Sequence, residues 1–97
     1  MDKLSEMFKA LGDPTRLRIM RMLAESGEIC VCKIQEALDM GQSAVSHHMA
    51  ALRHAGLVLH RREGQWVHYR INQEALESGP VAFLCELAER LARGEAA

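Results

Sequence analysis

The sequence predicts a mainly α (α+β) fold with about five helices and one β-hairpin. Three observations predict it. Apolar residues recur at helical spacing in most of the chain up to residue 56, they alternate between residues 57 and 71, and helical spacing returns from residue 80. The chain has 97 residues, which is enough for one domain spanning 1–97. A domain this small buries a modest core, so we expect oligomerisation to add to it.

Two helices are expected in the first quarter of the chain. The first covers residues 3–11, where apolar residues fall at i, i+3, i+4 and i+7, and Gly12 ends it. Asp13 and Pro14 then start a second helix that runs to about Glu25, because Asp caps free N–H groups and Pro suits the first helical position. Its expected buried stripe consists of Leu17, Met20, Leu23 and Ala24.

Two more helices, at residues 31–40 and 42–56, are joined by a short turn that contains Gly41. In the second of them Val45, Met49 and Leu52 make one apolar stripe. Another face carries small hydrogen-bonding groups and no acid: Ser43, Ser46, His47 and Ala50. Short side chains let a helix enter the major groove, where Ser, Gln or His can bond base edges. The pair therefore indicates a helix-turn-helix, although this helix alone is equally compatible with a polar surface helix.

A β-hairpin is expected directly after this helix pair. Its strands cover residues 57–62 and 66–71, with a turn at residues 63–65 and basic side chains at the tip. A basic hairpin in this position is typical of a wing, and the agreement between helix and hairpin favours nucleic-acid binding. The candidate DNA-binding residues are Gln42, Ser43, Ser46, His47, Arg53, Arg61, Arg62 and Gln65.

The distribution of charge supports the same partner. The net charge is −1, but residues 42–70 hold four arginines and all five histidines against one acid, Glu63. A local basic patch matters more for phosphate binding than the total charge, so we expect double-stranded DNA as the partner. No apolar run reaches membrane-spanning length and the first residues do not resemble a signal peptide. We therefore expect a cytoplasmic protein without a membrane partner.

The C-terminal part is expected to form a loose connection at residues 72–79 and a last helix from Pro80 to about Arg93. The apolar residues of this helix exceed what a terminal helix of a small monomer needs. We therefore expect a homodimer face shared with the first helix, with packing onto its own domain as the alternative. The residues concerned are Val81, Phe83, Leu84, Leu87 and Leu91.

The three cysteines are Cys30, Cys32 and Cys85, and this odd number argues against a disulfide framework. Cys30 and Cys32 are expected at a helix N-terminus, where the macrodipole favours thiolate, a ligand for soft ions. Residues two apart on a helix point roughly 200° apart, so one ion could bind both sulfurs only if the first turn opened. Burial in the core is the alternative for this pair and the expectation for Cys85, which is also a possible third ligand.

Four segments of the chain closely resemble the ArsR/SmtB family of small winged-helix repressors. They are residues 8–19 (FKALGDPTRLRI), 43–49 (SAVSHHM), 52–58 (LRHAGLV) and 61–64 (RREG) with Tyr69. The resemblance covers nearly the whole chain. It implies a winged helix-turn-helix repressor that dimerises through its first and last helices and leaves its operator when an inducer binds. It implies neither an enzyme nor a permanent cofactor.

Residues 28–32 (EICVC) resemble the Cys-Val-Cys metal box of the family's arsenic, antimony, cadmium and lead sensors. The implied inducer at Cys30 and Cys32 is As(III), Sb(III) or a soft divalent ion (Cd, Pb or Zn). Two departures are visible. Gln35 stands where arsenite sensors of the best-known type have a third cysteine, and no cysteine precedes Cys30, whereas the cadmium and lead sensors add cysteines from an N-terminal extension. The last helix also lacks the histidines of the family's zinc site.

Three alternatives for the cysteines stay open at this point. The same DNA-binding scaffold could respond to thiol oxidation or persulfide formation instead of metal. A thiol enzyme with a Cys–His pair is disfavoured because no acid or amide can be assigned to orient the histidine. A structural zinc module is disfavoured because a lone Cys-x-Cys lacks the second pair of ligands.

Overall fold

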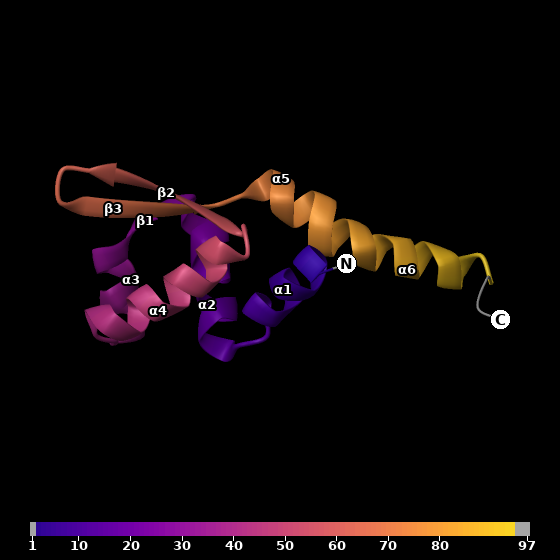
Figure 1. The fold of residues 1–97 in the computed structure, drawn as a ribbon, viewed down its shortest axis with the longest axis horizontal. Helices are drawn as coiled ribbons and strands as arrows, with labels where there is room; N and C mark the ends of the chain where they lie inside the picture. Colours follow the sequence, from indigo (N-terminus) through magenta and orange to yellow (C-terminus); the bar gives the residue numbers. More distant parts are fainter. Residues whose placement is uncertain (1, 95–97) are drawn as a thin grey trace.

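The computed structural model describes residues 2–94 and has a winged helix-turn-helix fold (Figure 1). Helices α1 to α4 and a small sheet form a rounded body, and the C-terminal helix projects from it. The predicted fold class is confirmed. The elements are α1 (Asp2–Leu11), α2 (Pro14–Ser26), β1 (Glu28–Cys30), α3 (Val31–Leu38), α4 (Gln42–His54), β2 (Val58–Glu63), β3 (Trp66–Ile71), α5 (Gln73–Leu76), the π-helical turn η1 (Glu77–Val81) and α6 (Ala82–Ala92).

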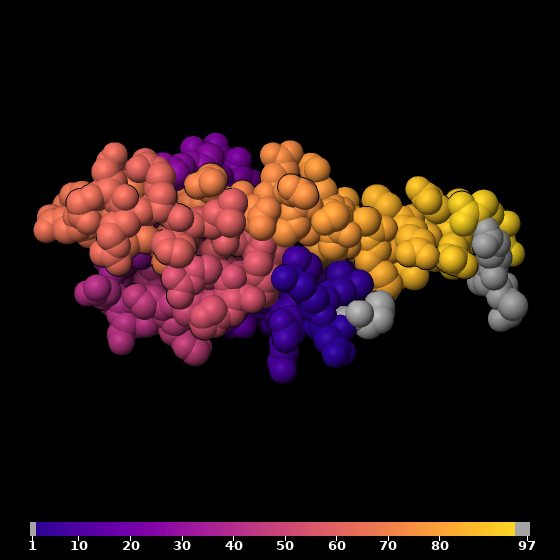
Figure 2. All heavy atoms as spheres, turned by 45° about the horizontal axis from the view of Figure 1, so that its top comes forward, coloured from indigo at the N-terminus to yellow at the C-terminus, as the bar shows by residue number. Residues whose placement is uncertain are grey.

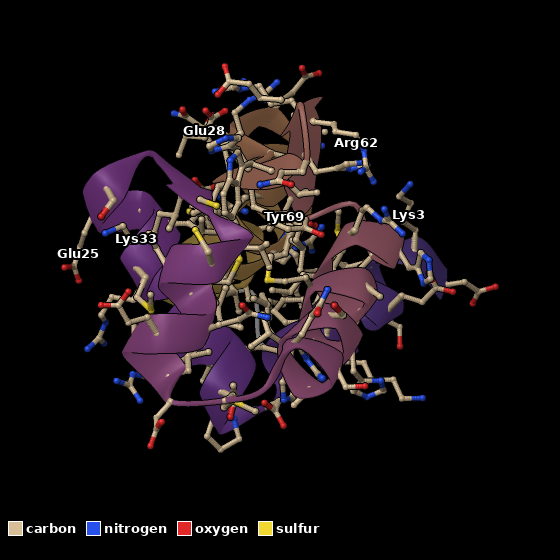
Figure 3. All side chains as sticks on the ribbon, turned by 90° about the vertical axis from the view of Figure 1, so that its left-hand side faces the viewer. Lys3, Glu25, Glu28, Lys33, Arg62 and Tyr69 are labelled. Atoms are coloured by element: carbon tan, nitrogen blue, oxygen red, sulfur yellow. The ribbon has the colours of Figure 1, made fainter. Side chains whose placement is uncertain are left out.

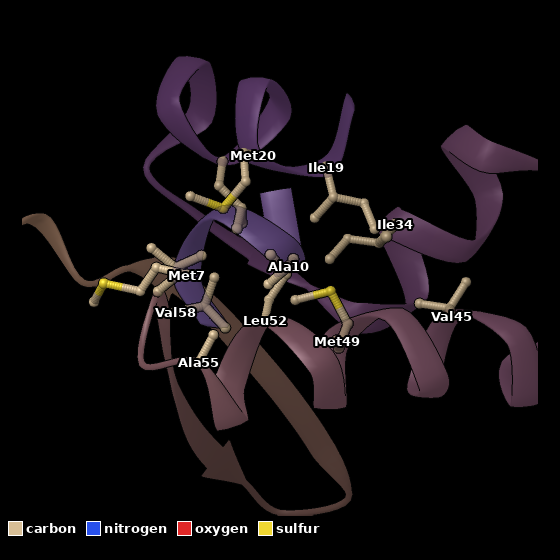
Figure 4. Close-up of a cluster of buried hydrophobic side chains, with 12 residues drawn as sticks. Met7, Ala10, Ile19, Met20, Ile34, Val45, Met49, Leu52, Ala55 and Val58 are labelled. Carbon is tan, nitrogen blue, oxygen red and sulfur yellow. The ribbon is translucent and has the colours of Figure 1, made fainter. Parts of the chain in front are cut away.

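The core lies where α1, α2, α3 and α4 meet the base of the sheet (Figure 4). The predicted stripe of α4 is confirmed, because Val45, Met49 and Leu52 are all fully buried. In α2 the predicted stripe is partly wrong, since Leu17 is 55% exposed and Ala24 is also exposed. Ile19 is buried in their place, because α2 turns the Ile19–Met20–Leu23 face toward α4 and β3.

Local signals account for the ends of these helices. The Asp13 carboxylate accepts a hydrogen bond from the Arg16 N–H at 3.1 Å and caps α2, as its sequence predicted. Gly56 follows α4 with φ of +79°, a left-handed conformation that glycine adopts without a steric penalty. This fixed end of α4 turns the chain directly into the wing.

The sheet has three antiparallel strands in the order β1-β3-β2, so the predicted two-stranded hairpin is incomplete. The third strand, β1, comes from residues 28–30, which were expected to lie in a turn and at a helix start. Cys30 faces His68 across the β1–β3 ladder, and Glu28 faces Arg70. The chain just before α3 is therefore part of the wing sheet.

The connection after β3 is helical and not loose, and Pro80 lies within a helix instead of starting one. A proline inside an α-helix removes a hydrogen bond and clashes with the carbonyl four residues earlier. The wider η1 turn avoids this, because the Ala82 N–H bonds the carbonyl of Glu77 five residues back. The chain thus stays helical from Gln73 to Ala92.

The molecule is elongated, with extents of 53 × 24 × 22 Å, because α6 projects beyond the body (Figure 2). Large apolar side chains of η1 and α6 lie uncovered in the single chain: Val81, Leu84, Leu87 and Leu91. Cys85 is also exposed, so in the single chain it does not take the core position predicted for it. Within the described residues, no helix is long and apolar enough to cross a membrane.

Candidate nucleic-acid interface and thiol site

Helix α4 presents a polar face to solvent while its opposite face is anchored in the core. Gln42, Ser43, Ser46 and His47 are all exposed, and the three core residues of the helix hold it against α2 and α3. The backbone of this exposed face carries small side chains, so a base edge can come close to it. Arg53 is exposed in the last turn of the same helix. The structure therefore brings together the α4 residues that the sequence proposed for DNA.

The wing separates the two arginines near its tip. In the β2–β3 ladder Arg62 faces Val67 and Arg61 faces His68, so their side chains lie on opposite faces of the sheet. Figure 3 shows Arg62 on the side of α4 and Glu28 on the side of α3. Gln65 is exposed in the turn between the strands. Arg62 is thus available on the side of α4, and Gln65 is exposed at the tip of the wing.

Arg61 is held by an ion pair with Glu28 of β1. Its Nε and Nη2 both donate to Glu28, at 2.9 and 2.7 Å to Oε1, and its Nη1 lies 3.4 Å from Glu63. The side-chain hydrogen bond from Arg61 holds the pKa of Glu28 below its usual range and raises the pKa of Arg61. This two-point contact ties β2 to β1 across the intervening strand.

Arg16 has a structural position that the sequence did not reveal. Its Nε donates to the carbonyl oxygen of Ala10 at 2.6 Å, and its Nη1 lies 3.2 Å from Nδ1 of His48. It therefore joins the end of α1, the start of α2 and the middle of α4. Beside it a hollow of about 410 Å³ opens between α1 and α4, lined in part by Lys9, His47 and His54. The sequence shows that residues 9 and 16 are basic, but helical periodicity could not predict that they lie beside α4.

Cys30 and Cys32 bring their sulfur atoms together without any opening of the α3 helix. Cys30 lies before the helix, as its N-cap residue, with an extended backbone (φ −67°, ψ 141°). Its sulfur accepts a hydrogen bond from the Cys32 N–H at 3.4 Å and lies 2.6 Å from the Cys32 sulfur. The expectation that the first turn must distort is therefore wrong, because the angle between residues two apart on a helix does not apply to a residue outside it.

The two thiols differ in acidity. The hydrogen bond from the Cys32 thiol, together with backbone N–H groups of the α3 N-terminus, lowers the pKa of Cys30 although burial opposes this. The same hydrogen bond, followed by burial and the nearby charge, raises the pKa of Cys32. Cys30 is thus the more acidic thiol of the pair, and Cys32 donates the hydrogen bond between them.

A hollow of about 640 Å³ borders Cys30, and Glu28, Lys33 and His68 share its lining. The Nε2 atom of His68 is buried and has no hydrogen-bond partner among residues 2–94. The carboxylate of Glu63 is 3.6 Å away, which is too long for a hydrogen bond. The hollow thus leaves room beside Cys30, but Cys32 does not line it.

The described residues contain no group of three or more His, Cys, Asp or Glu side chains placed to hold one metal ion. Among residues 2–94 of a single protomer, Cys85 on α6 is therefore not placed to form a three-sulfur site with Cys30 and Cys32. The donor set that remains is two sulfurs at the start of a helix. Such a pair suits a thiophilic centre that needs two protein ligands.

Comparison with known proteins identifies the family. The family model described as "Bacterial regulatory protein, arsR family" matches residues 13–59. An uncharacterised HTH-type transcriptional regulator of Methanocaldococcus jannaschii is 51% identical over 70 residues, which are 72% of this chain and 79% of that protein. The arsenical resistance operon repressor of Escherichia coli is 51% identical over 67 residues, 69% of this chain, and the match spans 57% of that repressor.

A solved structure supports the same assignment over the full length. The homodimeric winged helix-turn-helix DNA-binding domain of a possible ArsR-family regulator from Mycobacterium bovis superposes with a TM-score of 0.73 at 31% identity. The match covers 99% of this chain and 87% of that domain. The similarity thus includes the wing and the C-terminal helix as well as the helix-turn-helix. The chain belongs to the arsR family of bacterial regulatory proteins.

Proposed function

We propose that this chain is a homodimeric repressor that binds operator DNA and leaves it when a thiophilic inducer binds Cys30 and Cys32. The observation that carries the proposal is the convergence of the two sulfurs, 2.6 Å apart, at the N-terminus of α3. Helix α3 packs against α4, so the candidate inducer site adjoins the support of the candidate reading helix. The similarity to the Escherichia coli arsenical resistance repressor supports the same inducer class.

Trivalent arsenic or antimony fits the donor set better than a divalent ion. A tetrahedral Zn²⁺ site takes four protein ligands, and the described residues offer two sulfurs. Arsenite, As(OH)₃, can exchange two hydroxyl groups for the two sulfurs, and each hydroxyl leaves with a thiol proton as water. Arsenic keeps its oxidation state and its third oxygen. Cadmium, lead or zinc would need further ligands from solvent or from the second protomer.

In the DNA complex we assign base contacts to Ser43, Ser46 and His47, with Gln42 at the start of the helix. Phosphate contacts fall to Arg53, Arg62 and Gln65, because charged and polar side chains at the rim of the groove position a protein without reading bases. Arg61 was expected to join them. Its bond to Glu28 instead favours a role in holding the wing.

A homodimer follows from the apolar face of α6. Leu84 is 53% exposed and Leu91 is 68% exposed in the single chain, and contiguous apolar surface of this kind is typical of an interface. The edge-to-face contact of Phe8 and Phe83, with ring centroids 5.9 Å apart, joins α1 to this face. Two reading helices then address half-sites about 34 Å apart or a multiple of that spacing.

The test is an operator-release titration with arsenite, antimonite, cadmium, lead, zinc and an oxidant. We expect arsenite and antimonite to release the wild-type protein. Cys32→Ser should bind the operator normally but resist release, because serine keeps the size and loses the soft ligand. Cys85→Ser is the matched control and should respond as wild type. If arsenite still releases both Cys30→Ser and Cys32→Ser from the operator, these cysteines do not bind the inducer and have only a packing role.

A second candidate is a redox or persulfide switch on the same scaffold. The direct contact of the two sulfurs favours it, because a neighbouring thiol can resolve an oxidised Cys30. Intact mass separates the two candidates. Bound arsenite adds arsenic with loss of two waters, whereas an intramolecular disulfide removes two hydrogens and is reversed by a thiol reductant.

A further inference from the structure

The thiol pair and the Glu28–Arg61 ion pair lie at opposite ends of one three-residue strand, β1. We propose that inducer capture at the thiols moves the wing through β1, and that Glu28 is the positioning residue that ties this strand to Arg61. This coupling rests on the proposed function and specifies how the thiol site acts on DNA. The coupling implies that inducer binding affects the wing sheet as well as α3, the helix that supports α4.

Capture of one ion by both cysteines fixes the distance between their sulfurs. Two sulfurs bound to a tetrahedral ion at about 2.3 Å are about 3.7 Å apart. Cys30 and Cys32 belong to different elements, so the bound ion links β1 to the first turn of α3 and fixes the position of one against the other.

Of these two elements, β1 is the less deeply buried. Helix α3 is anchored by Ile34, which is fully buried, and by a bond from Arg18 to the carbonyl oxygen of Ala37 at 3.1 Å. Strand β1 is half-exposed and follows Gly27, whose φ is +85° and whose Cα has no neighbour close enough to meet a Cβ. A glycine in this conformation can act as a hinge. Displacement at Cys30 is thus carried by β1.

Strand β1 cannot move alone, because it is paired with β3 and tied to β2. Its three residues are in register with residues 68–70 of β3. The carboxylate of Glu28 reaches over that strand to Arg61 with two bonds shorter than 3 Å, and Arg70 approaches it at 4.0 Å. Arg61 is adjacent in sequence to Arg62, the arginine on the α4 side of the wing. A shift of β1 therefore reaches the proposed phosphate contact through two strands.

The single tryptophan of the chain reports on this movement without DNA. Trp66 begins β3, is 48% exposed, and lies on the same sheet face as His68 because the two are separated by one residue. A suitable probe is phenylarsine oxide, whose trivalent arsenic exchanges its oxygen for two sulfurs. Two thiol protons leave with that oxygen as one water, and no redox change occurs. This probe needs no third protein ligand.

The experiment compares wild type with Glu28→Gln, which removes the charge and keeps the shape. Intact mass measures capture, Trp66 fluorescence measures the wing, and operator affinity with and without the probe measures coupling. We expect both proteins to capture one probe per chain. Wild type should lose operator affinity by about 5- to 150-fold, the range of ordinary allosteric coupling. In Glu28→Gln both the fluorescence change and the affinity loss should shrink several-fold.

Glu63→Gln is the matched control. It removes an acid from the same sheet face and a weaker interaction with Arg61 at 3.4 Å, but it does not touch β1. We expect it to respond as wild type. Thermal unfolding confirms that the variants are folded. The charge-exchanged variant Glu28→Arg with Arg61→Glu re-forms the tie and should restore the Trp66 response if Glu28→Gln has lost it.

Three outcomes count against the coupling. Capture without a Trp66 change in wild type means that the cysteine side chains accommodate the ion by themselves. If Glu28→Gln keeps the full Trp66 change and the full loss of operator affinity, the Glu28–Arg61 ion pair does not transmit the effect. The same conclusion holds if Glu63→Gln reduces both readouts as much as Glu28→Gln does. If wild type captures the probe and Trp66 responds but the operator is not released, the proposed repressor function fails while the β1–wing connection stands. Absence of capture overturns both.

Discussion

At the scale of single residues, the position of Cys30 outside α3 decides the chemistry of the thiol pair. As the N-cap it directs its sulfur back onto the first turn, where the Cys32 N–H and the Cys32 thiol both donate to it. The free N–H groups at a helix start stabilise negative charge there. The same residue therefore caps the helix, supplies the more acidic thiol of the pair and ends the strand that joins the wing.

The first prediction is that Cys30 is alkylated before Cys32. The thiolate is the reactive form, and the lowered pKa of Cys30 leaves more thiolate near neutral pH, whereas the raised pKa of Cys32 leaves less. The labelling rate of Cys30 by iodoacetamide should level off at a lower pH than that of an ordinary thiol. Peptide mass spectrometry in a Cys85→Ser background measures both rates. Faster labelling of Cys32 would reverse the assignment of thiolate and donor.

The second prediction separates phosphate binding from base reading. Arg62→Ala should weaken binding to all DNA sequences and flatten the plot of log affinity against log salt by about 0.9 for each phosphate that the protein no longer neutralises. His47→Ala should instead reduce discrimination against altered half-sites, with about 1–3 kcal/mol per base pair at stake. Fluorescence anisotropy on operator and random DNA measures both. If His47→Ala weakens binding to operator and random DNA equally, His47 does not contact bases.

At the scale of elements, Asn72 joins the wing, α4 and the C-terminal helix. Its side-chain oxygen caps α5 by accepting from the Ala75 N–H at 3.2 Å, and its Nδ2 donates to the carbonyl oxygen of Gly56 at 3.0 Å. Its own N–H donates to the carbonyl of Leu57 at 2.9 Å. One side chain thus sets where the last helix leaves the body of the protein.

The third prediction is that Asn72→Ala lowers the free energy of unfolding by about 1–2 kcal/mol, because the variant lacks both a helix cap and a second part-buried hydrogen bond. Urea unfolding followed by circular dichroism measures it. Gln73→Ala is the neighbouring control, since Gln73 bonds Glu77 on the exposed surface and should cost less than about 0.5 kcal/mol. A cost for Asn72→Ala no larger than that of the control contradicts the structural role.

At the scale of the whole molecule, the projecting α6 leaves the single chain with an apolar face that its own body does not cover. The helix carries the exposed side chains of Leu84, Leu87 and Leu91. Its C-terminal segment projects beyond the rest of the molecule (Figure 2). Cys85 lies on the same helix and is exposed in the single chain. Assembly therefore decides the final environment of this helix.

The fourth prediction is that Leu84→Glu converts the dimer to a monomer and lowers operator affinity by at least about tenfold, because one protomer reaches one half-site. Light scattering at micromolar concentration measures the mass, and anisotropy measures binding. Leu59→Glu on the wing, at a residue 38% exposed, is the control for assembly and should leave the mass unchanged. A wild-type chain that is monomeric at this concentration contradicts the proposed dimer.

The helices at the start of the chain, the helix-turn-helix and the β2–β3 hairpin were predictable from sequence because their signals are local. Val45, Met49 and Leu52 repeat at the helical period, Asp13 and Pro14 mark a helix start, and strand alternation has a period of two. The exposed face of α4 follows from the same periodicity. The sequence thus determined both the fold class and the candidate reading helix.

Tertiary structure decided the features that depend on partners distant in the chain. Strand β1 has three residues, too few for a period, and it exists because β3, much later in the chain, pairs with it. This pairing places Cys30 outside α3, brings the sulfurs together and gives Glu28 its bond to Arg61. Strand alternation places Arg61 and Arg62 on opposite faces of the wing, but it does not determine which face lies beside α4. Sequence periodicity describes one element at a time, whereas these interactions are made between elements.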